Sequence, residues 1–191
     1  MVSLIDGYKP RFLETIYGPM RSGKTQAFRY MVNRLKYDFD IESKLFKPTI
    51  DDRNVGIETK AGEKMDAISL PVDNPMTICD YVGDSRLIGI DETQFFDEKE
   101  LIKTVFYLLE KGKSVLAAGL DTDAWTNPFG AMPYLISISH NSNKMVTQCR
   151  NDGCNDIAMF THKLGGDPNS TVEVGDDIYE PRCFRCHVIP E

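Results

Sequence analysis

The segment Gly18-x-x-x-x-Gly23-Lys24-Thr25 constrains the fold of this 191-residue chain more than any other feature. It matches the phosphate-binding P-loop pattern at every required position. An alternating segment from Arg11 to Tyr17 precedes it and is predicted to be a strand, and apolar residues at helical spacing follow it from Gln26 to Lys36. A strand, a glycine-containing turn and a helix in this order predict a loop that surrounds phosphate with backbone N–H groups.

The residue types in this loop indicate ATP and Mg²⁺ as ligands. Glycines let the backbone N–H groups turn toward phosphate oxygens, and the helix that follows adds the positive end of its dipole. Lys24 is expected to reach the β- and γ-phosphates, and the Thr25 hydroxyl to bind Mg²⁺. The predicted cofactor-binding residues of the loop are Gly18, Met20, Arg21, Ser22, Gly23, Lys24 and Thr25.

Further strands and helices alternate along the chain. Strands are expected at Leu45-Phe46, Arg86 to Ile90 and Ser114 to Ala118, and a helix from Leu101 to Glu110 that stops at Gly112. This alternation predicts an α/β fold, a P-loop NTPase-like parallel sheet flanked by helices. We expect this ATP-binding domain to span residues 1–145, and a small zinc-ribbon and lasso domain to span residues 146–191.

An acidic pair follows the apolar run that ends at Ile90. Ligands of open parallel sheets bind at the carboxyl ends of strands, so Asp91 and Glu92 can face the P-loop. Asp91 is the expected second magnesium anchor, and Glu92 can accept a proton from an attacking hydroxyl or water. A solvated acidic turn that caps the helix at Leu101 is the alternative. The pair alone does not distinguish a kinase from an ATPase.

Four of the five cysteines lie in the C-terminal segment as two pairs, Cys149-x₄-Cys154 and Cys183-x₂-Cys186. Four thiolates at such spacings favour a structural, tetrahedral Zn²⁺ site over free thiols. His187 is an alternative to Cys186 as the fourth ligand. Cys79 stands alone and is expected to be a small buried hydrophobic residue.

The charge and the hydropathy of the chain bear on its partners. The net charge of −7 disfavours general nucleic-acid binding, because an acidic surface repels a polyphosphate backbone. No segment approaches the roughly 20 apolar residues that cross a bilayer. Residues 1–10 are acidic and polar where a signal peptide has its apolar core. A cytoplasmic protein without membrane or nucleic-acid partners is therefore expected.

Three more segments, taken with the P-loop and the cysteines, resemble one enzyme family. They are Lys47 to Arg53, Asp91 to Phe96 and Gly119 to Gly130. The ensemble, from about Phe12 to Cys186, resembles the type II, cytosolic-type thymidine kinases. The resemblance implies transfer of the ATP γ-phosphate to the 5′-hydroxyl of thymidine, with deoxyuridine accepted as well. It also implies a homo-oligomer, commonly a tetramer.

The resemblance assigns roles to individual residues. It implies that Glu92 is the general base, that Arg53 faces the phosphates near the reacting centre and that Asp51 is its acidic neighbour, with Lys24 completing the catalytic set. It places an apolar wall and a threonine around the base, and a lasso loop over it. These substrate-binding residues are Met20, Phe95, Leu120, Thr161, Val172, Val174 and Tyr179.

Two positions depart from the family pattern. Ala124, followed by Trp125, occupies the place of a pocket-lining phenylalanine, and Thr93 is larger than the usual small residue. A zinc-ribbon P-loop ATPase that acts with nucleic acid or a protein partner is the main alternative function. It leaves Gly119–Gly130 and the lasso unexplained. A non-catalytic nucleotide-binding regulator is a second alternative.

Overall fold

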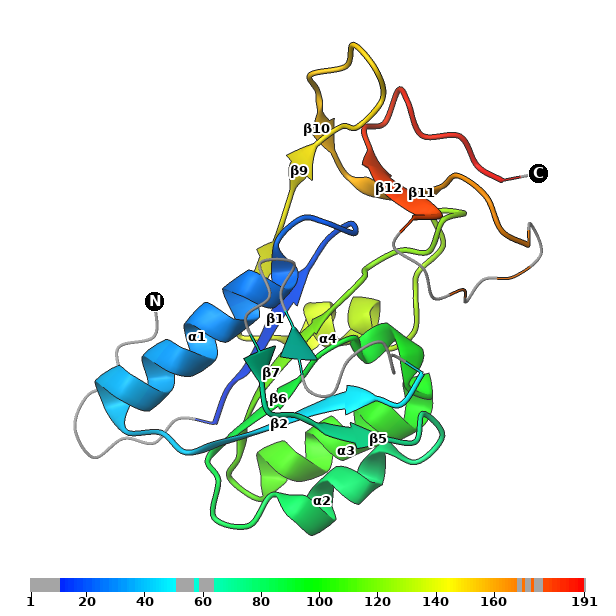
Figure 1. The fold of residues 1–191 in the computed structure, drawn as a ribbon. Helices are drawn as coiled ribbons and strands as arrows, with labels where there is room; N and C mark the ends of the chain where they lie inside the picture. Colours follow the sequence, from blue (N-terminus) through cyan, green and yellow to red (C-terminus); the bar gives the residue numbers. More distant parts are fainter. Residues whose placement is uncertain are drawn as a thin grey trace.

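A parallel β-sheet forms the centre of the computed structural model, which describes residues 11–50, 57–58, 64–167, 170, 173 and 177–190. In this part of the chain the largest sheet has six strands in the order β5-β2-β6-β7-β1-β8, and every neighbouring pair is parallel (Figure 1). The strands are β1 (Leu13–Tyr17), β2 (Ser43–Pro48), β5 (Ile68–Leu70), β6 (Leu87–Ile90), β7 (Ser114–Gly119) and β8 (Asn141–Lys144).

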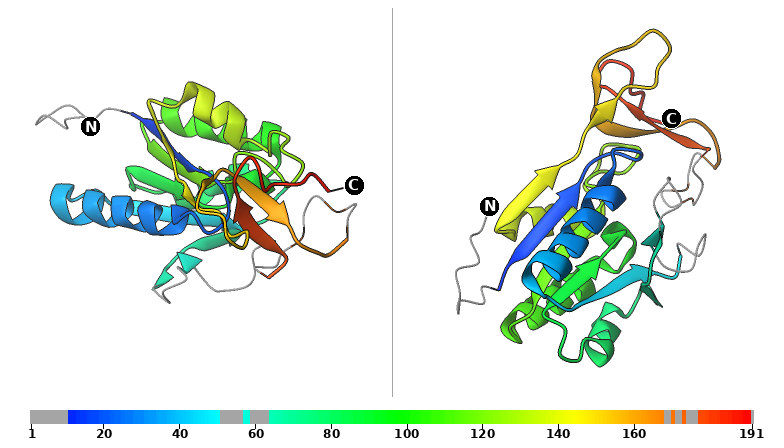
Figure 2. Two further views of the ribbon diagram at one scale, coloured as in Figure 1. Left: turned by 90° about the horizontal axis from the view of Figure 1, so that it is seen from above. Right: turned by 60° about the vertical axis from the view of Figure 1, so that its left-hand side comes forward.

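Helices cover both faces of this sheet. Helix α1 (Lys24–Phe39) lies on one face, and α2 (Ile78–Tyr81), α3 (Glu98–Glu110) and α4 (Met132–Ile138) lie on the other (Figure 2). Two apolar clusters result. Phe28 and Val32 of α1 pack with Ile16 and Leu116, and the helices opposite pack around Ile88 and Ile90. The middle strands are buried on both faces, which is why β6 and β7 read as continuous apolar runs.

The helix boundaries follow from local chemistry. Helix α1 begins after Gly23, whose φ of 87° suits glycine, and is followed by Asp40 in the left-handed region. Helix α3 is capped by Asp97, whose carboxylate accepts a hydrogen bond from the backbone N–H of Glu100 at 3.0 Å. The alternative in which the acidic pair caps this helix is therefore wrong, and Asp91 and Glu92 are left for other contacts.

The sequence-based elements are confirmed with shifted ends. The strand expected from Arg11 begins at Leu13, the helix expected from Leu101 begins one turn earlier, and the strand at Leu45-Phe46 extends over Ser43–Pro48. Several elements were not predicted, including β5, β8, α2 and α4. Strand β8 is polar, with the sequence Asn-Ser-Asn-Lys, because it lies at the edge of the sheet where one side is solvated.

Small antiparallel strand pairs follow in the C-terminal segment. Strand β9 (Thr147–Gln148) pairs with β10 (Ile157–Ala158), and β11 (Phe160–Lys163) pairs with β12 (Tyr179–Arg182). These pairs lie beyond the carboxyl ends of the central strands, above the loop between β1 and α1 (Figure 1). The remaining elements are the hairpin β3 (Ile57–Glu58) and β4 (Lys64–Met65) and two 3₁₀ turns, η1 (Pro75–Thr77) and η2 (Thr93–Phe95). Within the described ranges, none of the helices combines the length and apolar character needed to span a bilayer.

Candidate active site

The P-loop connects β1 to α1 and is held against the strand next to it. Gly18 has a φ of 134°, and a Cβ there would overlap the carbonyl oxygen of Met145. Met145 in turn donates its backbone N–H to the carbonyl of Tyr17 at 2.6 Å. Glycine is thus required at position 18 both by the backbone conformation and by the approach of a neighbouring chain segment. Met145 therefore supports the first turn of the loop.

Lys24 occupies the interior of this loop. Its residue is 8% exposed, and its ammonium donates to the carbonyl of Pro19 at 2.9 Å. Burial lowers the pKa of Lys24, while the charges of Glu92, Asp91 and Asp121 act in the opposite direction. A cation that is desolvated and surrounded by backbone donors can bind an anion strongly. The predicted ATP-binding lysine and the acidic pair therefore belong to one site.

Ser22 provides a direct observation on what the loop can hold. Its hydroxyl oxygen is buried and has no hydrogen-bond partner among the described residues. Buried hydroxyls are normally paired, and an exception calls for a ligand or water. A phosphate oxygen between Ser22, Lys24 and the N-terminus of α1 would satisfy this group. The loop therefore fits a polyphosphate, and Thr25, which is half-buried at the start of α1, lies in the position of the magnesium-binding hydroxyl.

The strand order brings the acidic pair to the right distance from the loop. Strand β7 separates β1 from β6, and neighbouring strands lie 4.7–4.9 Å apart, so β6 ends roughly 10 Å from the P-loop strand. Asp91 is 5% exposed and follows β6 directly. Its carboxylate accepts the backbone N–H of Glu92 at 2.9 Å, and its own N–H donates to Phe46. The acidic pair and the P-loop therefore lie at the same edge of the sheet, with one strand between them.

Glu92 is half-buried and has a backbone φ of 50°, in the left-handed region that non-glycine residues rarely adopt. Its carboxylate accepts a hydrogen bond from the Gln94 side-chain amide at 2.5 Å. The next residue, Thr93, is fully buried and donates its hydroxyl to the carbonyl of Ala118 at 3.0 Å. The larger residue at position 93 is therefore accommodated by a hydrogen bond to β7.

The predicted nucleoside-binding residues lie in two groups. Leu120 is 8% exposed and follows β7, and Phe95 makes an edge-to-face contact with Phe129 at a centroid distance of 5.8 Å. Met20 and Thr161 form the second group, in which the backbone N–H of Met20 donates to the Thr161 hydroxyl at 3.0 Å. The P-loop and the C-terminal strand pairs are thus bonded directly. Phe129 was missed in the sequence because a lone aromatic after a proline carries no distinctive pattern.

Ala124 and Trp125 take different positions in the structure. Ala124 is buried at 5% exposure, and the Lys163 ammonium lies 5.6 Å from the centroid of the Trp125 ring. Lys163 also pairs with Glu173 at 2.5 Å. On the next strand Tyr179 lies opposite Lys163, and burial raises the pKa of its phenol. Trp125 is therefore held against β11, the strand that carries Thr161. Lys163 was not predicted as part of the site.

Four predicted site residues, Asp51, Arg53, Val172 and Val174, lie outside the described residues. Ile50, directly before Asp51, and Glu173, between the two valines, are the nearest described residues. The roles of these four residues therefore remain predictions.

The four C-terminal cysteines come together as one cluster. The sulfur atoms of Cys149, Cys154, Cys183 and Cys186 all lie within 4.8 Å of one another, and those of Cys154 and Cys183 are 3.7 Å apart. Tetrahedral Zn–S bonds of about 2.3 Å place sulfurs about 3.8 Å apart, so the cluster fits Zn²⁺. Although burial opposes ionisation of Cys183, backbone N–H groups of Cys186 and Arg185 lower the pKa of its thiol to about 7.

His187 lies beside this cluster, and the ligand set that the structure brings together contains Cys186 instead. The His187 ring packs on Phe160 at 5.1 Å and on His162 at 5.4 Å. Burial and the neighbouring His162 lower the pKa of His187, which favours the neutral ring.

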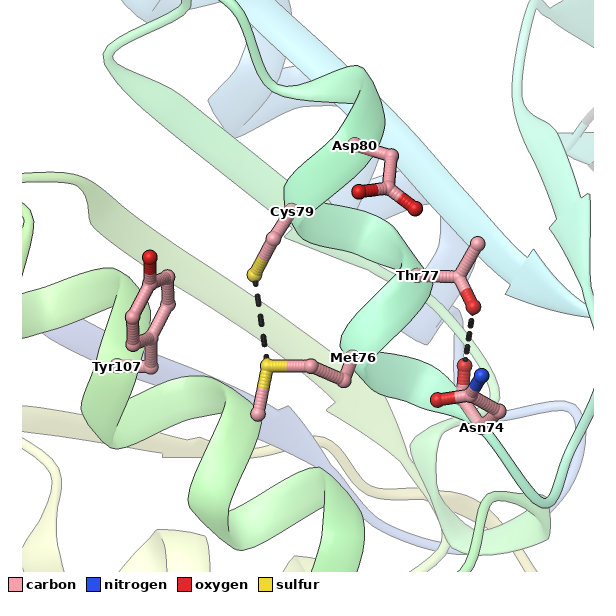
Figure 3. A pocket seen from close by; sticks show the side chains of 6 residues that line it. All are labelled: Asn74, Met76, Thr77, Cys79, Asp80 and Tyr107. Atoms are coloured by element: carbon pink, nitrogen blue, oxygen red, sulfur yellow. Dashed lines mark hydrogen bonds between the residues drawn. The ribbon is translucent and has the colours of Figure 1, made fainter.

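A shallow pocket of about 420 Å³ lies away from these residues, between η1, α2 and α3 (Figure 3). Cys79 lines it and donates its thiol to the sulfur of Met76 at 3.6 Å. Burial and Asp80 raise the pKa of this thiol, which disfavours the reactive thiolate. Cys79 packs against the core as the predicted small hydrophobic residue, but it is half-buried and not buried.

Known proteins resemble this chain over most of its length. The family model for thymidine kinase matches residues 11–187. A thymidine kinase of Mycoplasma genitalium is 36% identical over 192 aligned residues, covering 94% of this chain and 87% of that protein. One of Bacteroides thetaiotaomicron is 33% identical over 176 residues, covering 92% and 86%. Domain III of the Thermotoga maritima replication initiation protein DnaA overlaps at a TM-score of 0.41 and 15% identity, over 71% of this chain and 55% of that one, too little to argue from.

Proposed function

Because the chain belongs to the thymidine kinase family, we propose that it transfers the γ-phosphate of ATP to the 5′-hydroxyl of thymidine and so forms dTMP. Deoxyuridine is a second expected substrate. The observation that carries the proposal is the position of buried Lys24 beside Glu92 and Asp91, at the ends of β1 and β6. A cation for the phosphates and a carboxylate for the hydroxyl are thereby supplied from opposite sides of one space.

The P-loop residues bind the phosphate donor. Lys24, backbone N–H groups of the loop such as those of Arg21 and Gly23, and the hydroxyl of Ser22 surround the phosphates, and the N-terminus of α1 adds its positive dipole end. Thr25 and Asp91 are the residues that would hold Mg²⁺, which supplies charge neutralisation to the transferred group. Lys24 stabilises the negative charge that spreads over the equatorial oxygens during transfer.

Glu92 is proposed as the general base. Its carboxylate takes the proton of the 5′-hydroxyl as that oxygen bonds to phosphorus and the bridging oxygen leaves with ADP. One carboxylate oxygen is bound by Gln94, which leaves the other for the substrate. Arg53 is proposed to add a second cation at the reacting centre, with Asp51 beside it.

The nucleoside is proposed to bind between the segment after β7 and the C-terminal strand pairs. Met20, Phe95 and Leu120 supply apolar walls, and Thr161 and Tyr179 lie on the strands opposite. Val172 and Val174 are proposed to close over the base through their main chain. A structural Zn²⁺ on the four cysteines would hold the strand pairs on both sides of that loop.

Family membership does not favour the zinc-ribbon ATPase as an alternative. The regulator hypothesis has less support, because Lys24, Asp91 and Glu92 lie together as phosphoryl transfer requires. The tetramer, the cytoplasmic location and the domain boundary at residue 145 stay predictions.

The test is product formation from ATP and Mg²⁺ with thymidine, deoxyuridine, deoxycytidine or no nucleoside. Thymidine and deoxyuridine should give monophosphates. Glu92→Gln should bind ATP normally and lower kcat by about 10²–10⁴-fold, the usual range for loss of a general base. ATP hydrolysis without any nucleoside monophosphate would refute the kinase. A Glu92→Gln variant with near-normal kcat would remove Glu92 from the base role.

A further inference from the structure

A buried side-chain amide connects the carboxylate of Glu92 to the backbone of the predicted nucleoside pocket. Gln94 is 3% exposed and lies in η2, two residues beyond Glu92. Its Nε2 donates to the Glu92 carboxylate at 2.5 Å, and its Oε1 accepts the backbone N–H of Leu120 at 3.0 Å. A continuous chain of hydrogen bonds therefore runs from Leu120 through Gln94 to Glu92.

The chemistry of the two partners fixes the orientation of this amide. The backbone N–H of Leu120 can only donate, so it must face the amide oxygen. The amide NH₂ then faces an ionised carboxylate, which can only accept. Rotating the amide by 180° would place donor against donor and acceptor against acceptor. Gln94 is the kind of side chain that satisfies both ends, and a carboxylate or an apolar residue is not.

The surrounding backbone leaves room for this amide and little else. A Cβ at Gly119 would overlap the Gln94 Oε1, and a Cβ at Gly130 would overlap the Gln94 carbonyl oxygen. Thr93, the residue between Glu92 and Gln94, is bonded to Ala118 of β7. The η2 turn is thus bonded to Ala118 and packed closely against Gly119, both in β7, and against Gly130, which leaves Gln94 little room to move.

We propose that Gln94 is a positioning residue that holds the Glu92 carboxylate in its proton-accepting orientation and ties that orientation to the Leu120 backbone. The inference rests on the proposed role of Glu92 as the base. What it adds is that the Gln94 amide orients the Glu92 carboxylate. The Glu92 backbone and a direct ionic contact do not.

Glu92 requires such a partner because little else fixes its side chain. The residue is half-buried, with its backbone in the left-handed region. Its backbone N–H is bound to Asp91, and this bond leaves the carboxylate free to rotate. Lys24 attracts the carboxylate, but it must also serve the phosphates. A misplacement of about 1 Å at a reacting group can cost about 10²-fold in rate.

Leu120, at the end of the hydrogen-bond chain away from Glu92, connects the base to nucleoside binding. Leu120 belongs to the segment proposed to contact the nucleoside, and its N–H is occupied by Gln94. A nucleoside that packs on Leu120 therefore holds one end of the hydrogen-bond chain whose other end orients the Glu92 carboxylate. Loss of Gln94 should act on the chemical step more than on the binding of ATP.

The test compares Gln94→Leu, which keeps the volume and removes both hydrogen bonds, with Thr104→Val. Thr104 is fully buried in α3, away from the site, and donates to Glu100 at 2.8 Å, so its variant is a control for loss of a buried hydrogen bond. Gln94→Leu should lower kcat by about 10–100-fold with the KM for ATP within about 2-fold. Thr104→Val should keep the wild-type kcat.

A double-mutant cycle separates positioning from general damage to the fold. In the Glu92→Gln background the base is already lost, so adding Gln94→Leu should lower kcat by less than about 2-fold further. Equal losses in the two backgrounds would overturn the inference, as would a Gln94→Leu variant that matches Thr104→Val. If Glu92→Gln alone keeps its activity, the proposed base fails instead. The two failures are thus distinguishable.

Discussion

The bond between the P-loop and the C-terminal strands can be tested by removing one hydroxyl. Thr161 is 3% exposed, and its side-chain oxygen accepts the backbone N–H of Met20 at 3.0 Å. Thr161→Val keeps the shape of the side chain and replaces the oxygen by a methyl group. Thr161→Ser keeps the oxygen and removes only a methyl group, so it is the matched control.

The expected cost follows from what the substitution leaves unpaired. A buried donor without a partner costs about 1–3 kcal/mol, and because Met20 is half-buried the lower half of this range applies. For a chain of this size, 1 kcal/mol corresponds to about 2–4 °C in Tm. Thr161→Val should therefore lower Tm by roughly 2–8 °C, and Thr161→Ser by less.

The assay is thermal unfolding of the zinc-loaded protein without nucleotide or nucleoside, so that effects on substrate binding do not enter. A Thr161→Val variant that unfolds at the wild-type temperature would refute the reasoning, because the bond would then add nothing. A larger loss in Thr161→Ser than in Thr161→Val would assign the effect to methyl packing. Under our reasoning Thr161→Val should also raise the KM for thymidine.

Two further predictions concern the charged and metal-binding residues. Burial lowers the pKa of Lys24 from 10.5, so the unfolded chain binds this proton more tightly and wild-type stability rises with pH above the folded-state pKa. Lys24→Met should abolish kinase activity and raise Tm at pH 7, with a gap to wild type that narrows as the pH approaches 10.5; a lower Tm at pH 7 would contradict this. Cys186→Ser should lose bound zinc in elemental analysis, whereas His187→Ala should retain one ion per chain, and zinc loss in His187→Ala would reassign the ligand.

Much of the fold could be predicted because it depends on strong local patterns. The P-loop, the buried runs of β6 and β7 and the amphipathic helix α3 all carry their signal within about a dozen residues. Strand β8 carries no such signal, since its Asn-Ser-Asn-Lys sequence is polar throughout and is held to β1 by backbone pairing and by the amides of Asn141 and Asn143, which donate to Glu14. Short elements such as α2 and β5 depend on the sheet that they join.

In the candidate site, too, the residues in local motifs could be predicted and those joined by long-range contacts could not. Lys24, Asp91, Glu92 and the four cysteines lie in motifs whose spacing reflects their chemistry. Gln94 was visible in its motif, yet its partner Leu120 lies 26 residues away and is bound through the backbone, which no side-chain pattern records. Lys163 pairs with Trp125 and Glu173 in the same non-local way. Long-range contacts of this kind require the folded chain.

The contacts of Met145 with Tyr17 and Gly18 limit where the sequence could be cut to exchange segments between related enzymes. Residue 145 ends the predicted ATP-binding domain, and by sequence it is a natural site for a cut. Its N–H is bonded to Tyr17 and its carbonyl packs on Gly18, so the last residue before the cut also supports the first turn of the P-loop. In a chimera joined at this position, a foreign C-terminal segment that moves Met145 would distort the P-loop. Exchange of nucleoside-binding segments between relatives should therefore succeed only when the junction lies beyond Val146, with β8 and its turn kept from the parent that provides the loop.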